Sequence, residues 1–190
     1  VEEDVAFGPE NKNVEPEKIR KIVETVLQKV RLWERRKASP SRLSGGQKQR
    51  LATADALAGL PGCLVLDEPT AMLDPDSRKE VINIVKELNR KEGMTIILIT
   101  HHTDEVVDAD RIVLMKDGKI IGDDIPKKIF TDYELLKKAK MDIPPIVELG
   151  MRLEKQQIGL EGPILQEEEM IEKIVKLYRS KCGGKKDAAR

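Results

Sequence analysis

The chain has 190 residues, enough for one ordinary domain or for one domain with a small appendage. Lys+Arg and Asp+Glu number 34 each, and this balance argues against a nucleic-acid-binding surface, which needs a basic excess or stripe. Hydrophobic residues make up 39% and aromatic residues 3%, so the core is expected to be aliphatic. The spacing of Cys63 and Cys182 indicates neither a disulfide nor a metal site, which fits a reducing cytoplasm.

The first part of the chain predicts a loop and then two helices. Gly8-Pro9 marks the loop, and apolar residues at a 3.6-residue period predict a core-facing helix from Pro16. The turn Ser44–Gln47 then opens a second helix that runs through Ala58. A Ser-Gly-Gly-Gln turn at a helix start presents unpaired backbone N–H groups, and such an end attracts phosphate.

The apolar segment Cys63–Leu66 predicts a buried strand, which ends in two adjacent carboxylates. Asp67 can face a magnesium ion at the carboxyl end of the strand, and Glu68 can act on a water molecule as a general base. Alone, a glycine pair before a helix is usually a tight turn, and an acidic pair after a strand is often a solvated loop. Their order and spacing together favour a site for a nucleoside triphosphate.

A further helix and strand follow. Asp74 caps a predicted helix that ends at Gly93, and Thr95–Ile99 predicts a second strand. Strand, helix and strand in this order predict a parallel pair covered on both faces. Because neighbouring residues at a strand end point to opposite sides, His101 and His102 are not expected to share a metal ion, and His102 is expected to face solvent.

The last part of the chain predicts a hairpin and several helices. Asp117-Gly118 indicates a hairpin turn between two short strands. Two amphipathic helices are expected over Ile146–Leu153 and Met170–Tyr178, and the tail from Cys182 onward is expected to be disordered.

Three of these segments resemble motifs of ABC-type ATPases. Ser44–Gln47 resembles the signature motif, Cys63–Glu68 the Walker B segment, and His101 the switch histidine. Val1–Asn11 is similar to the segment after the Q-loop in energy-coupling factor (ECF) transporter ATPases. Met141–Leu153, with the helix of the tail, is similar to their carboxyl-terminal extension. The resemblance covers nearly the whole chain.

The resemblance implies an α/β fold. The expected fold class is the carboxyl-terminal portion of an ABC-type, RecA-like P-loop ATPase domain, with part of the helical subdomain and a small α-helical carboxyl-terminal extension. The expected division is a helical subdomain with the signature motif over 1–60, the RecA-like ATPase core over 61–140, and the helical extension with its tail over 141–190.

The resemblance also implies ATP and Mg²⁺ as cofactors. Asp67 is expected to hold the magnesium ion, and the expected catalytic residues are Glu68 and His101, with His101 bonded to the γ-phosphate. The signature residues are expected to contact a γ-phosphate held by the opposite subunit, and Asp74 belongs to the D-loop. The expected nucleotide-binding residues are Ser44, Gly45, Gly46, Gln47 and Asp74.

The implied function is ATP hydrolysis in an ECF-type importer that takes up vitamins or transition-metal ions. The implied partners are a second ATPase subunit, a transmembrane coupling subunit and a substrate-binding membrane subunit, with no nucleic acid. The implied location is the cytoplasmic face of the cell membrane.

One departure from the family pattern is large, since no Gly-x-x-x-x-Gly-Lys-Ser/Thr sequence is present. In the family this phosphate-binding loop lies upstream of the position of Val1, so we interpret the chain as the carboxyl-terminal part of a longer protein. A protein that lacks the loop altogether is the alternative. The isolated chain is expected to be poorly soluble and to hydrolyse no ATP.

Other functions remain open. The chain could be a truncated, inactive interaction module that docks on a full-length ATPase subunit. A DNA-repair or chromosome ATPase would carry long coiled coils, which this sequence does not show. A ribosome-associated relative would need a second ATPase cassette.

Overall fold

The computed structural model describes all residues except 157, 159, 161–163 and 183–190. The described part divides into two compact units, Val1–Thr100 (unit 1) and His101–Arg190 (unit 2). The division expected from the sequence, with boundaries near residues 60 and 140, stays a prediction. The disorder expected from Cys182 onward is wrong for Cys182, which ends a helix, and the rest of that tail, 183–190, lies outside the described residues.

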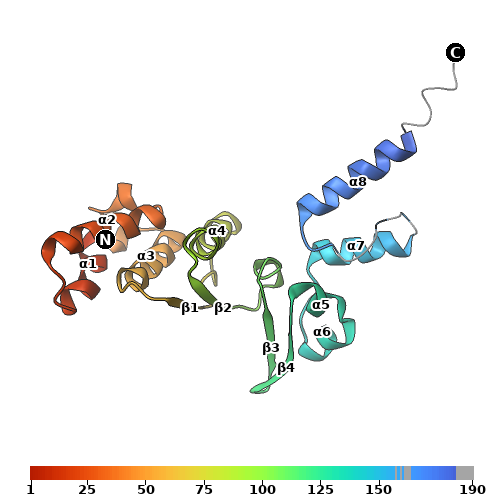
Figure 1. Ribbon diagram of the computed structural model, residues 1–190, viewed down its shortest axis with the longest axis horizontal. Coiled ribbons are helices and arrows are strands. Elements are labelled where there is room, and N and C mark those ends of the chain that lie inside the picture. Colours follow the sequence, from red (N-terminus) through yellow and green to blue (C-terminus); the bar gives the residue numbers. More distant parts are fainter. Residues whose placement is uncertain (157, 159, 161–163, 183–190) are drawn as a thin grey trace, which may run out of the picture. The chain divides into compact units, whose positions relative to one another are not determined.

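Unit 1 combines helices with a parallel pair of strands (Figure 1). Its elements are α1 (Glu2–Asn11), α2 (Pro16–Lys29), the short 3-10 helices η1 (Trp33–Arg35) and η2 (Pro40–Arg42), α3 (Gly45–Ala58), β1 (Cys63–Asp67), α4 (Pro75–Glu92) and β2 (Thr95–Ile99). The predictions for α2, α3, α4 and both strands are confirmed. Helix α4 ends at Gly93, whose φ of 66° lies in the left-handed region that glycine tolerates at a helix end.

The amino-terminal segment differs from its prediction, because Gly8-Pro9 lies inside α1 and not in a loop. Pro9 removes one backbone donor from the last turns of the helix. It is nevertheless buried, and Val5 on the preceding turn is fully buried in the core shared with α2 and α3. Tertiary packing therefore outweighs the local effect of the proline.

Strands β1 and β2 pair in parallel, with Cys63 opposite Thr95 and Asp67 opposite Ile99. Leu64 and Leu66 point into the core, whereas Val65, Ile97 and Ile99 on the other face are 56%, 49% and 49% exposed. The predicted pair covered on both faces is therefore wrong for this unit: helices cover one face only. The open apolar face fits the expected poor solubility of the isolated chain.

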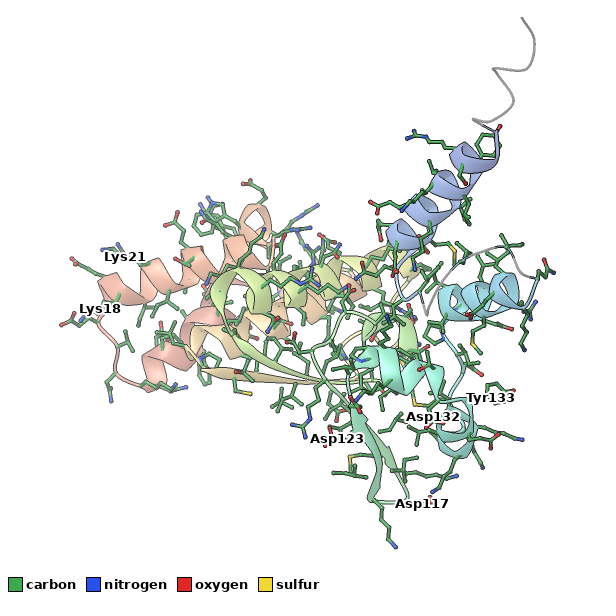
Figure 2. The ribbon with its side chains drawn as sticks, turned by 45° about the vertical axis from the view of Figure 1, so that its right-hand side comes forward. Lys18, Lys21, Asp117, Asp123, Asp132 and Tyr133 are labelled. Atoms are coloured by element: carbon green, nitrogen blue, oxygen red, sulfur yellow. The ribbon has the colours of Figure 1, made fainter. Side chains whose placement is uncertain are left out.

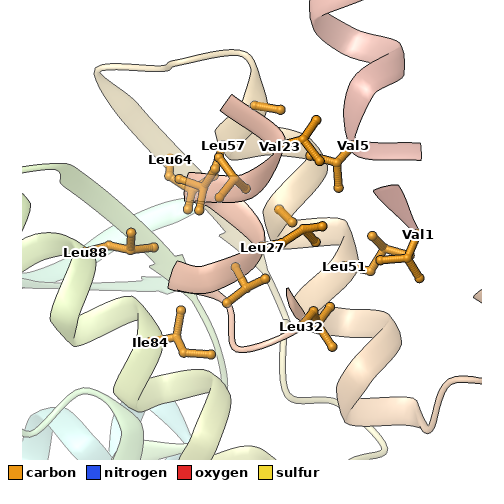
Figure 3. Close-up of a cluster of buried hydrophobic side chains, with 14 of the residues drawn as sticks. Val1, Val5, Val23, Leu27, Leu32, Leu51, Leu57, Leu64, Ile84 and Leu88 are labelled. Carbon is orange, nitrogen blue, oxygen red and sulfur yellow. The ribbon is translucent and has the colours of Figure 1, made fainter. Parts of the chain in front are cut away.

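The core of unit 1 is aliphatic, as the composition predicts. Figure 3 shows side chains from α1–α4 and from β1 that meet there, and they include Val5, Val23, Leu27, Leu51, Leu57, Leu64, Ile84 and Leu88. Leu27 and Val5 are fully buried. This cluster fixes α3 and α4 on the same face of the sheet, and these two helices carry the residues of interest.

Unit 2 begins with a hairpin and continues with helices. Its elements are the 3-10 helix η3 (Thr103–Glu105), β3 (Ile112–Lys116), β4 (Lys119–Asp124), α5 (Pro126–Thr131), α6 (Tyr133–Ala139), α7 (Pro145–Lys155) and α8 (Glu167–Cys182). Asp117 and Gly118 have φ values of 49° and 73°, so the predicted hairpin turn is confirmed. Figure 2 shows Asp117 at the hairpin tip and Asp123 farther along β4, where Arg111 donates to Asp123 at 2.7 and 2.6 Å.

One carboxyl group of unit 1 gives the stability of the fold a pH dependence. Desolvation at the contact of α3 with α1, reinforced by the charge of Asp4 and partly offset by the Val1 amino group, raises the pKa of Asp55 from 3.8 to about 6. The folded state thus binds this proton more tightly than the unfolded state. The protonated Asp55 carboxyl group therefore contributes stability to the fold that is fully present below about pH 4 and is lost as the pH rises through about 6.

We therefore expect Asp55→Asn to be more stable than the parent chain at pH 8 and to lose that advantage at pH 4. Although the contact with α1 removes part of the carboxyl group from water, the Asp55 residue is still exposed, so solvent screens its charge and the gain at pH 8 should not exceed about 1 kcal/mol. Urea unfolding at both pH values measures it. An equal difference between the two proteins at pH 4 and pH 8 would contradict the assignment.

Candidate functional site

The turn at Ser44 closes a complete capping box at the start of α3. The Gln47 amide donates to Ser44 Oγ at 3.3 Å, and the Ser44 amide donates to Gln47 Oε1 at 3.0 Å. This reciprocal pair fixes the helix start that the sequence predicts. In this box Ser44 Oγ and Gln47 Oε1 act only as acceptors, so the Ser44 O–H and the Gln47 side-chain NH2 could still donate to a phosphate with the box closed. The contact to the γ-phosphate stays a prediction.

Gly46, two residues after Ser44, lies where the start of α3 packs against the start of α4. A Cβ atom at Gly46 would lie 2.8 Å from both Cβ and Oγ of Ser77, a separation that real side chains do not adopt. A Cβ atom at Gly45 would meet only Leu73 Cδ2, at an ordinary 3.5 Å. Gly46 is therefore required for the close approach of the two helix starts, whereas Gly45 is exposed and open.

The carboxyl end of β1 presents the predicted carboxylates. Asp67 is the last residue of the strand, is exposed, and lies on the open face of the sheet with Val65. Glu68 is half-buried and has a φ of 47°, and its amide donates to the Ile99 carbonyl at 2.9 Å. A non-glycine residue in this region is costly and occurs often at functional sites. At Glu68, the residue expected to act as the general base, the backbone therefore turns away from the direction of β1.

The loop after Glu68 leads directly into α4. Pro69 and Thr70 are buried, whereas Met72 is fully exposed and has a φ of 63°. Asp74 then caps α4, because its Oδ1 accepts from the Ser77 amide at 3.0 Å. Hydrogen bonds from the Ser77 side chain and amide lower the pKa of the Asp74 carboxyl, so it is held as the anion. The expected D-loop is thus a fixed turn anchored at its end.

The two histidines differ from the prediction. Their rings lie together, with centroids 4.1 Å apart and planes tilted by 37°, and not on opposite sides of the chain. His101 is exposed and His102 is half-buried, the reverse of the expected solvent-facing His102. The reason is local: β2 ends at Ile99, so the alternation of a strand no longer applies two residues later. Among the described residues no group of three side chains is placed to hold a metal ion.

The structure thus brings several of the predicted residues into one arrangement in unit 1. The signature turn and the first turn of α4 touch through Gly46 and Ser77, and Asp67 and Glu68 lie at the start of the loop that enters α4. His101 is the first residue of unit 2 and is described apart from them. The roles expected for Ser44, Gly45, Gly46, Gln47, Asp67, Glu68, Asp74 and His101 stay predictions.

Two residues of this arrangement escaped sequence reasoning. Ser77 has a usable signal, because it lies three residues after the capping Asp74, the position whose amide a cap accepts from. Arg50 has none: a basic residue inside a predicted helix is usually solvent-exposed, whereas this one is buried.

The family model described as ABC transporter matches residues 1–71. The energy-coupling factor transporter ATP-binding protein EcfA1 of Caldanaerobacter subterraneus is 55% identical over 174 residues, 92% of this chain and 63% of that protein. The protein of the same name from Clostridium novyi is 49% identical over 177 residues, 93% of this chain and 63% of that protein. The chain therefore spans somewhat less than two thirds of the length of these relatives.

Solved structures of ABC-type ATP-binding proteins also resemble this chain. CbiO1 of Clostridium perfringens, described as part of the ABC transporter complex CbiONQ, matches with a TM-score of 0.65 and 34% identity over 79% of this chain and 59% of that chain. The ATP-binding cassette MJ0796, solved as a dimer with ADP and Pi, matches with a TM-score of 0.52 and 33% identity over 60% of this chain and 49% of that chain.

Proposed function

We propose that this chain, a homologue of the ATP-binding subunits of energy-coupling factor transporters, is the carboxyl-terminal portion of the ATP-hydrolysing subunit of such an importer. Its homology to these subunits and its fold class, part of an ABC-type P-loop ATPase domain, are the two sequence-based expectations that the relatives and solved structures confirm. The activity of the whole subunit, its cargo and its partners belong to the proposal.

The observation that carries the proposal is the contact of Gly46 with Ser77. It brings the signature turn against the start of α4, so that these two segments lie side by side. Ser44, Gly46 and Gln47 at this surface are the expected contacts to the γ-phosphate of an ATP held by a second subunit.

The residues at the end of β1 fit the chemistry of ATP hydrolysis. Mg²⁺ takes hard oxygen ligands and commonly uses one or two carboxylates together with phosphate oxygens, so the exposed Asp67 carboxylate fits it. When bound, magnesium neutralises charge on the phosphates. Glu68 would accept the proton of the attacking water, and His101 would hydrogen-bond a γ-phosphate oxygen.

The partners are proposed as a second ATPase subunit and membrane subunits for coupling and substrate binding, at the cytoplasmic face of the membrane. Vitamins or transition-metal ions are the proposed cargo. Among the described helices none is long and apolar enough to span a bilayer.

The second candidate function is the interaction module without catalysis. The observation that favours it is the open apolar face of β1 and β2, where Val65, Ile97 and Ile99 are about half exposed. The experiment that separates the two functions is binding of this chain to the full-length Caldanaerobacter relative with and without Mg·ATP. Nucleotide-dependent binding is expected for a signature half-site, whereas binding that ignores the nucleotide favours the module.

A further inference from the structure

Arg50 on α3 is a buried cation whose partners lie on α4 and at the end of α2. Its residue is only 9% exposed, although it lies on α3 one turn after the signature turn. Its guanidinium donates to Glu80 Oε1 on α4 at 2.8 Å, and to the carbonyl oxygens of Val30 and Arg31 at the end of α2, both at 3.4 Å. A charge that is removed from water in this way must be satisfied by its surroundings.

The end of α2 gives this cation a favourable site. Val30 is the C-cap of α2, and Arg31 has a φ of 57°, so the chain turns there in the left-handed region. The carbonyl groups at the end of a helix carry partial negative charge, which a cation stabilises. All three bonds come from one guanidinium nitrogen, Nη1, whose two hydrogens are shared between the Glu80 carboxylate and the two more distant carbonyls.

The pair Arg50–Glu80 also repeats the contact of Gly46 with Ser77 one turn farther along both helices. Arg50 follows Gly46 by one turn of α3, and Glu80 follows Ser77 by one turn of α4. Gly46 permits the two helix starts to approach, and the hydrophobic cluster holds α3 and α4 together. The ion pair one turn away adds a directional contact near the helix starts.

We propose that Arg50 is a positioning residue, which holds the turn Ser44–Gln47 in register with the first turn of α4 through its contacts to Glu80, Val30 and Arg31. Arg50 is not catalytic, since its side chain is turned into the packed helices. What the positioned turn binds rests on the proposed function, whereas the positioning itself does not.

The test measures hydrogen exchange of the Gln47 amide, which donates to Ser44 Oγ, alongside global unfolding by urea in the same chain. The variants are Arg50→Met, Arg50→Lys and Glu80→Gln. The matched control is Lys29→Met, which removes an exposed ion pair to Glu92 that also joins α2 to α4 but does not reach α3.

We expect Arg50→Met to speed exchange of the Gln47 amide at least about 10-fold more than its change in global unfolding explains. Arg50→Lys keeps the charge and one bond, so its effect should be smaller, and Lys29→Met should give none. If exchange at Gln47 follows global unfolding in every variant, Arg50 is only a stability residue and the proposal is wrong. Should Arg50→Met fail to fold, Arg50→Lys and Glu80→Gln decide by the same comparison.

The proposed function can fail without this inference, because hydrogen exchange needs no nucleotide. Mg·ATP-dependent binding to the Caldanaerobacter relative is measured on the same variants. Absence of that binding in the parent chain would count against the proposed function alone. Suppose instead that the parent chain binds in a nucleotide-dependent way, that Arg50→Met weakens this binding, and that Lys29→Met leaves it unchanged. This result would support both the proposed function and the positioning role of Arg50.

Discussion

Replacement of Glu68 by Gln is expected to lower ATP turnover by about 10²–10⁴-fold, the usual contribution of a general base. The measurement uses a chimera in which this chain follows the amino-terminal segment of the Caldanaerobacter relative, so that a phosphate-binding loop is supplied. Glutamine has the same shape but cannot accept the proton of water at neutral pH. It also keeps the backbone turn, whose amide donates to the Ile99 carbonyl at 2.9 Å.

Two readouts separate catalysis from folding in this experiment. Phosphate release should fall, while ATP binding by the chimera should stay within about twofold, because a proton acceptor acts in the transition state. Asp76→Asn is the matched control, since it neutralises an exposed acid in the first turn of α4 and should leave turnover nearly unchanged. Turnover of the Glu68→Gln chimera within a few-fold of the parent would exclude Glu68 as the base.

Gly46→Ala is expected to lower the free energy of unfolding of the chain by about 1–3 kcal/mol, as overpacked sites do. The new Cβ would lie 2.8 Å from Cβ and Oγ of Ser77, so α3 must move away from α4. Urea denaturation of the isolated chain measures the loss. The same movement should weaken any nucleotide contact made by the signature turn.

Two further variants test the cause of this loss. Gly45→Ala places its Cβ at an ordinary 3.5 Å from Leu73 Cδ2 and should not destabilise the chain, because alanine favours helix more than glycine does. The double variant Gly46→Ala with Ser77→Gly removes both clashing atoms and should recover much of the loss. If Gly46→Ala is as stable as Gly45→Ala, the close approach of the two helices is not real.

Most elements of the fold could be predicted because their signals are local. The cap at Asp74 and the stop at Gly93 bound α4, and Asp117-Gly118 bounds the hairpin. The error at α1 arose because Pro9 has a strong local preference that packing overrides. The open face of β1 and β2 could not be predicted, since strand periodicity does not say which layers are present to cover a sheet.

The site was predictable as a set of residue types but not as an arrangement. The sequence places Asp67 and Glu68 at a strand end, yet the left-handed backbone of Glu68 follows from tertiary contacts. The contact of Gly46 with Ser77 joins residues 31 positions apart in sequence, and no local pattern reports it. The stacked rings of His101 and His102 depend on where β2 ends, which is the least certain part of a strand prediction.

The most direct test of the central claim is sedimentation velocity of this chain mixed with full-length EcfA1 of Caldanaerobacter subterraneus, with and without Mg·ATP. We expect a complex that forms with Mg·ATP, dissociates when ATP is replaced by ADP, and is weakened by Gly46→Ala. A complex of equal strength with and without nucleotide would contradict this expectation. The segment Leu43–Asp74 would then be part of a docking surface and not of an ATP site.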